Sequence, residues 1–162
     1  VCFTEDSEGI DSNIRIESLP NVPLEGWWYK PMFFNPNLAV KGTILFFDLD
    51  VVIFRNIDHL FTYNPDKFYI IRDFNRFVMK GYQKFNSSVF RLNTGQHSEV
   101  WTNFIKNSDS IIKRYQGDQD WIRVCITQNF NFWPDEWIQS YKWEMRGKPR
   151  FDSKPKGKRD FA

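Results

Sequence analysis

The sequence predicts an α/β domain with a mixed, mainly parallel sheet flanked by helices, and three observations support this. Apolar runs of strand length, the pattern of strands covered on both faces, occur at 43–47 and 68–71. Segments with the apolar spacing of amphipathic helices follow at 94–107 and 118–125. Aromatic residues make up 19% of the 162 residues, so the chain can bury a substantial core.

The elements before the first apolar run are short. Residues 1–5 predict a strand that ends in a polar turn, and alternation over 14–19 predicts a half-buried strand. The aromatic-dense stretch 24–34 predicts a helix that begins after Gly26. Because strand character begins at Val1 itself, we expect the sequence to be a piece of a longer protein.

Later elements follow the same logic. The apolar character resumes at 51–54, directly after Asp48-Leu49-Asp50. Residues 85–92 alternate between apolar and polar residues around Asn86-Ser87-Ser88. Residues 110–115 either extend the helix at 94–107 or begin a second one. Residues 132–143 are aromatic and predict extended chain interrupted by Pro134.

Charge divides the chain into a predicted single domain at 1–145 and a basic tail with Gly and Pro at 146–162. The net charge is +5 over 145–162 and −3 over 1–144. A solvated tail explains this block of like charge, and the chain has no aromatic-basic signature of a nucleic-acid-binding domain. No apolar stretch is long enough for a transmembrane segment, and no signal-peptide pattern is visible in these residues. With Cys2 and Cys125 expected as buried thiols in a reducing compartment, we expect a cytoplasmic protein.

The strongest local signal is the Asp48-Leu49-Asp50 sequence after the first apolar run. Alternation along a strand points Asp48 and Asp50 the same way, at the end where α/β sheets bind ligands. Two poorly solvated carboxylates repel each other, so either one stays protonated or a cation binds between them. Mg²⁺ or Mn²⁺ shared with a substrate diphosphate would remove the repulsion, whereas in the simpler alternative one Asp only caps a turn.

Residues 44–52 (Ile-Leu-Phe-Phe-Asp-Leu-Asp-Val-Val) resemble the opening motif of haloacid-dehalogenase-type phosphatases. The resemblance implies that Asp48 attacks phosphate and that Asp50 acts as a general acid. Val51 replaces the usual Gly of that motif, and strand-like segments precede it, so this phosphatase is the alternative interpretation.

More of the chain, about 22–145, resembles GT-A fold glycosyltransferases of family 8 and related bacterial sugar transferases. The motifs are GTILFFDLDVVIFRNIDHLF at 42–61, FNSSVFRL at 85–92 and GDQDWI at 117–122, with EGWWYK at 25–30 and WPDEWIQSYKW at 133–143. The resemblance implies the GT-A fold, a short strand after the DxD, and transfer of a sugar from a nucleotide-sugar donor to a glycan or lipid-linked acceptor. The strand that holds the nucleoside in that family would precede Val1, and no His follows Trp143 to serve as its third metal ligand.

The resemblance also implies roles for individual residues. Asp48 and Asp50 would hold Mn²⁺ or Mg²⁺ against the donor diphosphate. Three residues, Asn86, Ser87 and Ser88, would contact the donor sugar. Three more, Asp118, Gln119 and Asp120, would lie at the reacting carbon: Gln119 in a retaining enzyme, or a carboxylate as the base in an inverting one.

Simpler structural roles compete with several of these assignments. Asp118 and Asp120 also suit the first turn of any helix, where carboxylates interact favourably with the helix dipole. We assign to the core the tryptophans that could stack on sugars, at positions 27, 28, 133, 137 and 143. A truncated domain that folds without catalysis is a further alternative, and apolar surface left open by absent strands would promote a homodimer.

Overall fold

The computed structural model describes residues 1–146, and the basic tail predicted at 146–162 lies outside them except for Arg146. The structure is mixed α/β, with a mixed sheet flanked by helices. Its elements are β1 (Cys2–Phe3), β2 (Ile16–Glu17), the 3₁₀ helix η1 (Gly26–Phe34), β3 (Thr43–Phe47), α1 (Asp58–Thr62), β4 (Tyr69–Arg72), the 3₁₀ helix η2 (Phe74–Phe77), β5 (Phe85–Asn93), α2 (Glu99–Lys106), α3 (Ser108–Arg114), α4 (Asp118–Cys125), β6 (Asn131–Phe132) and the π-helix η3 (Tyr141–Met145).

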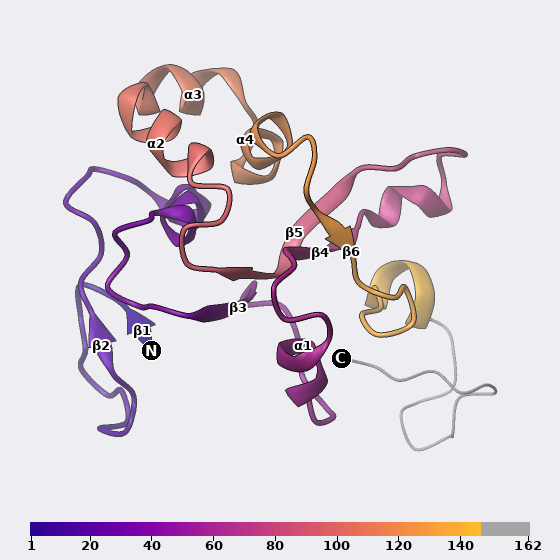
Figure 1. The fold of residues 1–162 in the computed structure, drawn as a ribbon, viewed down its shortest axis with the longest axis horizontal. Coiled ribbons are helices and arrows are strands. Elements are labelled where there is room, and N and C mark those ends of the chain that lie inside the picture. Colours follow the sequence, from indigo (N-terminus) through magenta and orange to yellow (C-terminus); the bar gives the residue numbers. More distant parts are fainter. Residues whose placement is uncertain (147–162) are drawn as a thin grey trace.

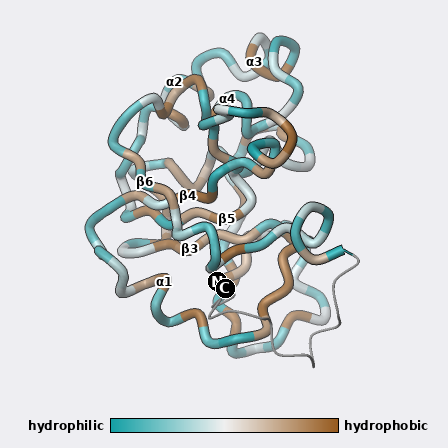
Figure 2. Tube along the Cα trace, turned by 90° about the vertical axis from the view of Figure 1, so that its right-hand side faces the viewer, coloured by the Kyte–Doolittle hydropathy of each residue, from teal (hydrophilic) through white to brown (hydrophobic). Residues whose placement is uncertain are grey.

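The main sheet has the strand order β3-β5-β4-β6 and lies between two layers (Figure 1). Helices α2, α3 and α4 lie beyond one face and α1 beyond the other, as the turned view also shows (Figure 2). Hydrophobic colours gather along the strands in Figure 2, where both faces of the sheet are covered. None of the helices within residues 1–146 is long and apolar enough to cross a membrane.

The prediction of a mainly parallel sheet is wrong. Strand β5 lies between β3 and β4 and is antiparallel to both, and only β4 and β6 pair in parallel. The connection at 73–84 contains only the short 3₁₀ helix η2 and no α-helix that would carry the chain across the sheet, so β5 returns antiparallel alongside β4.

The prediction that 43–47 is covered on both faces is also wrong, although the strand bounds are correct. β3 is at the edge of the sheet, and its apolar residues are only half-buried. The doubly covered strands are β4 and β5. Phe90 packs toward the helices, stacked on Phe46 at 4.8 Å, while Val89 faces the opposite layer.

Other predicted elements differ in detail. Residues 51–54 form no regular strand, and Val52, Ile53 and Phe54 are exposed. The segment at 110–115 belongs to a separate helix, α3, and the predicted extended segment at 132–143 ends in the first residues of a π-helix. Phe3 contacts Phe33 with ring centroids 5.7 Å apart, which attaches β1 and β2 to η1.

The burial of Cys125, the last residue of helix α4, leads to a testable prediction about the reactivity of its thiol. The pKa of the Cys125 thiol is raised to about 11, mainly by burial and in addition by the charge of Glu99. Since the thiolate is the reactive form, we expect Cys125 to react with iodoacetamide at pH 8 about 100-fold more slowly than an ordinary cysteine. The unfolded chain loses this proton first, so the thiol's contribution to stability is full below pH 9 and falls as the pH rises toward 11.

The measurement is alkylation followed by mass spectrometry in a Cys2→Ser variant, in buffer and in urea. Unfolding in urea should restore the ordinary rate. Alkylation of the folded protein at the rate of free glutathione would contradict the expected protection of Cys125.

Candidate functional site

The candidate site forms around Lys30, a lysine in the aromatic helix η1. Its side chain is only 8% exposed, and its stem lies against Phe46, with Nζ 5.3 Å from the ring centroid. A buried ammonium ion requires charged partners, and Lys30 has two. Nζ lies 2.8 Å from Asp48 Oδ1 and 2.9 Å from Asp118 Oδ2.

A buried serine completes the cluster. Lys30 Nζ donates to Ser87 Oγ at 3.3 Å, and the same hydroxyl donates to Asp118 Oδ2 at 3.1 Å. Residues from η1, β5 and the start of α4 therefore meet the residue that follows β3. We call Lys30, Asp48, Ser87 and Asp118 the Lys30 cluster.

A bulge in β5 makes room for this cluster. Ile70 of β4 pairs with Phe90, but the next residue, Ile71, pairs with Asn86, so three β5 residues lie opposite one step of β4. The bulge frees backbone groups for new partners. Ser87 N–H donates to Gln119 Oε1 at 2.9 Å, and Asp48 N–H donates to the Ser88 carbonyl at 2.8 Å. Bulges commonly redirect side chains beside functional sites.

The structure thus brings together some of the predicted site residues. Asp48, Ser87, Asp118 and Gln119 lie within one hydrogen-bonded network, although up to 71 positions separate them in the sequence. Asn86 and Ser88 contribute to the local turn, where Ser88 N–H donates to Asn86 Oδ1 at 2.8 Å.

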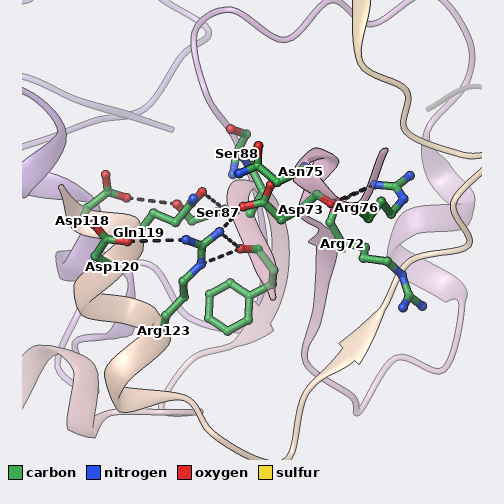
Figure 3. Close-up of polar contacts among 12 residues, drawn as sticks. Arg72, Asp73, Asn75, Arg76, Ser87, Ser88, Asp118, Gln119, Asp120 and Arg123 are labelled. Atoms are coloured by element: carbon green, nitrogen blue, oxygen red, sulfur yellow. Dashed lines mark hydrogen bonds and ion pairs between the residues drawn. The ribbon is translucent and has the colours of Figure 1, made fainter. Parts of the chain in front are cut away.

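Two predicted residues lie apart from the cluster. Asp50 is exposed in the turn after β3. Asp120 points to Arg123, with Oδ1 and Nη1 3.4 Å apart, while Asp118 contacts Ser87 (Figure 3). Successive residues of a helix face different directions, which explains why the three residues 118–120 do not act as one group.

Arg123 has a role that the sequence did not indicate. Its guanidinium pairs with the buried Asp73 at the end of β4, and its Nε donates to the Phe85 carbonyl at 2.8 Å (Figure 3). Arg123 therefore fixes α4 to the beginning of β5, the two elements that supply Asp118 and Ser87.

Lys30 is the main functional candidate that the sequence analysis missed. The signal was present, because Lys30 interrupts an apolar and aromatic stretch whose members Trp28 and Phe34 are buried in the core. A lysine at such a position needs a buried acidic partner. The spacing within η1 cannot show which carboxylates those are, since they come from elsewhere in the chain.

A cavity of about 1100 Å³ opens beside the cluster, between η1, β3 and the first residues of the chain. Its walls include the apolar rings of Tyr29, Phe33 and Phe46. Its polar lining is formed by Lys30, Asp48, Asp50 and Asp118. The cavity thus combines a large apolar surface with one charged end, the usual composition of a site for a small organic molecule or a cofactor.

Lys30 does not act as a base toward Ser87 in this arrangement. A serine beside a lysine is one form of an activated nucleophile. Here the Ser87 hydroxyl donates its hydrogen to Asp118 Oδ2, and Lys30 Nζ lies between two carboxylates, so the pair lacks the hydrogen bond from nucleophile to base. The cluster is suited to holding a polar ligand through donors and acceptors in fixed positions.

Comparisons with protein-family models, curated proteins and solved structures yield no match to this chain.

Proposed function

We propose that the protein is a metal-dependent glycosyltransferase that transfers a sugar from a nucleotide-sugar donor to a glycan or lipid-linked acceptor. One observation carries the proposal. Asp48, Ser87 and Asp118 come from the three separate motifs of the family-8 resemblance, and all three contact Lys30 at the charged end of one cavity. Such convergence is expected of a binding site and has no cause in local sequence pattern.

The cavity suits a donor with an aromatic end and an anionic end. The rings of Tyr29, Phe33 and Phe46 provide an apolar wall against which a nucleobase could pack. At the other end Lys30 lies between Asp48 and Asp118, and a divalent cation bound to these carboxylates would attract the diphosphate. The volume of about 1100 Å³ is sufficient for a nucleotide-sugar.

The carboxylates at this end fit a hard divalent cation. Lys30 offsets only one of the charges of Asp48 and Asp118, and the exposed Asp50 adds another at the same cavity. Carboxylate oxygens are ligands that Mg²⁺ and Mn²⁺ prefer. Within residues 1–146 no group of three or more His, Cys, Asp or Glu forms a ready-made metal cage, so diphosphate and water would complete the coordination. A bound ion would stabilise the charge that develops on the leaving diphosphate.

The protein's own residues would then position the sugar. Ser87 Oγ and Lys30 Nζ both bond to Asp118, which fixes its carboxylate at the cavity, where it could accept hydrogen bonds from sugar hydroxyls. Gln119 is held by Ser87 N–H, so its amide is oriented before substrate binds. At the start of α4, we assign Asp118 and Gln119 to the side of the site that faces the reacting sugar carbon. Asp120 instead contacts Arg123.

The test is a thermal-shift titration with UDP-sugars and nucleoside diphosphates, with and without Mn²⁺. A ligand at 100 times its Kd stabilises the folded state by about 2.7 kcal/mol, which should raise the Tm by about 5–10 °C. We expect a Mn²⁺-dependent shift that is lost in Asp48→Asn/Asp50→Asn. Asp109→Asn, at an exposed aspartate on α3, is the control and should retain the shift.

The outcomes separate the alternatives. A nucleotide shift that persists unchanged in the double variant would exclude these aspartates from donor binding. Hydrolysis of p-nitrophenyl phosphate that disappears in Asp48→Asn, without any nucleotide shift, would favour the phosphatase. Absence of both would leave a domain that folds without catalysis.

A further inference from the structure

The connection between β4 and β5, residues 73–84, extends beyond the neighbouring ribbon and begins with η2 (Figure 1). We call it the β4–β5 arm. Its base is closed by a hydrogen bond from Asp73 N–H to the Lys84 carbonyl at 2.9 Å. Asp73 also caps η2 by accepting from Asn75 N–H at 2.8 Å, and Met79 N–H donates to the Asn75 carbonyl at 2.9 Å.

Three consecutive apolar side chains are exposed on this arm. Phe77, Val78 and Met79 are 47%, 60% and 53% exposed. Such runs are unusual on a protein surface without a binding role. The hydrogen bonds of the arm hold these side chains outward, so the apolar surface is a fixed feature of the fold.

Positive charge surrounds the apolar side chains. Residues 72–84 contain four Lys or Arg and one acidic residue, Asp73, a net charge of +3. Asp73 already pairs with Arg123, and both arginines of the segment reach toward Asp135. Lys80 and Lys84 are exposed and have no carboxylate partner within residues 1–146.

We propose that the β4–β5 arm docks on an anionic lipid bilayer, with Phe77, Val78 and Met79 inserted at the interface. Lys80 and Lys84 would lie among the headgroups, where cations near an anionic surface favour binding. A projecting segment with adjacent apolar side chains can enter the deformable interface of a bilayer without a matching groove.

The arm is also coupled to the Lys30 cluster. Asp73 at its base pairs with Arg123, which holds the start of β5 and contacts Asp120 of α4 (Figure 3). Docking would therefore orient the cluster relative to the bilayer. This last step rests on the proposed function: such an orientation favours a lipid-linked acceptor over a free glycan.

The experiment is co-sedimentation of the full chain with two kinds of vesicle. One contains phosphatidylcholine alone, and the other contains about 40% phosphatidylglycerol, which makes its surface anionic. We expect binding to the anionic vesicles that weakens as salt rises from about 0.05 to 0.5 M. Phe77→Ser/Met79→Ser and Lys80→Glu/Lys84→Glu should each lower the partition coefficient about tenfold or more.

Matched controls lie elsewhere on the surface. Val124 on α4 is 53% exposed, close to the 60% of Val78, so Val124→Ser is compared with Val78→Ser. Lys113→Glu on α3 is the control for charge. Absence of binding by the parent chain, or equal losses in arm and control variants, would overturn the proposal and favour a protein or glycan as partner. No nucleotide is present, so failure here leaves the donor-binding test unaffected.

Discussion

Replacement of Lys30 by Met should cost about 3 kcal/mol of folding free energy, because it leaves the carboxylates of Asp48 and Asp118 without their shared cation. Met keeps the length and the apolar contacts of the lysine stem. The loss is large against the 5–15 kcal/mol that stabilises a typical domain. Urea denaturation followed by circular dichroism measures it directly.

The same substitution should abolish the Mn²⁺-dependent nucleotide shift, even at temperatures where the variant is folded. Two further variants identify the cause. Lys113→Ala, at an exposed lysine on α3, should change stability by less than about 0.5 kcal/mol. Adding Asp118→Asn to Lys30→Met removes one of the uncompensated charges and should restore part of the stability. If the urea concentration at the unfolding midpoint is the same for Lys30→Met and for the parent, the cluster is not the stabilising charge network described above.

Replacement of Arg91 by Ala should cost about 3–5 kcal/mol. This arginine is fully buried in the middle of β5. Its guanidinium donates to the carbonyls of Leu60 at 2.6 Å and Asn64 at 2.7 Å, with Lys67 at 3.0 Å. Truncation leaves buried carbonyls unpaired and opens a cavity, and both effects destabilise.

The surroundings of Arg91 add to its importance. The guanidinium carbon lies 5.1 Å from the Tyr69 ring centroid and 5.3 Å from that of Trp133, so the side chain connects the α1 turn to the layer beneath β4. Burial also lowers the pKa of Arg91 from its ordinary value.

Arg91→Lys should recover little, because one ammonium group cannot reproduce the planar fork of donors. Arg114→Ala, at an exposed arginine on α3, is the matched control. Chemical denaturation of the three variants provides the comparison. A loss in Arg91→Ala as small as in Arg114→Ala would show that the carbonyls find other partners.

The helices and strands that could be predicted from the sequence are those whose apolar residues recur at a regular spacing. The bounds of β3 and α4 follow from an apolar run and from helical spacing, and Asp48 could be recognised as a candidate because it follows such a run. These features depend on neighbours within a few positions, where side-chain direction is set by backbone geometry. Ser87, Asp118 and Gln119 became candidates only through the resemblance to family-8 glycosyltransferases.

Only the tertiary structure decided strand direction, the edge position of β3 and the partners of Lys30. Lys30 and Asp118 are 2.9 Å apart in space but belong to η1 and α4. No local period relates such positions, and their pairing depends on how η1 packs against the sheet. The same packing separates Asp118 from Asp120, since one contacts Ser87 and the other Arg123. Local pattern and motif resemblance thus identified the candidate residues, while long-range packing selected which of them share a site.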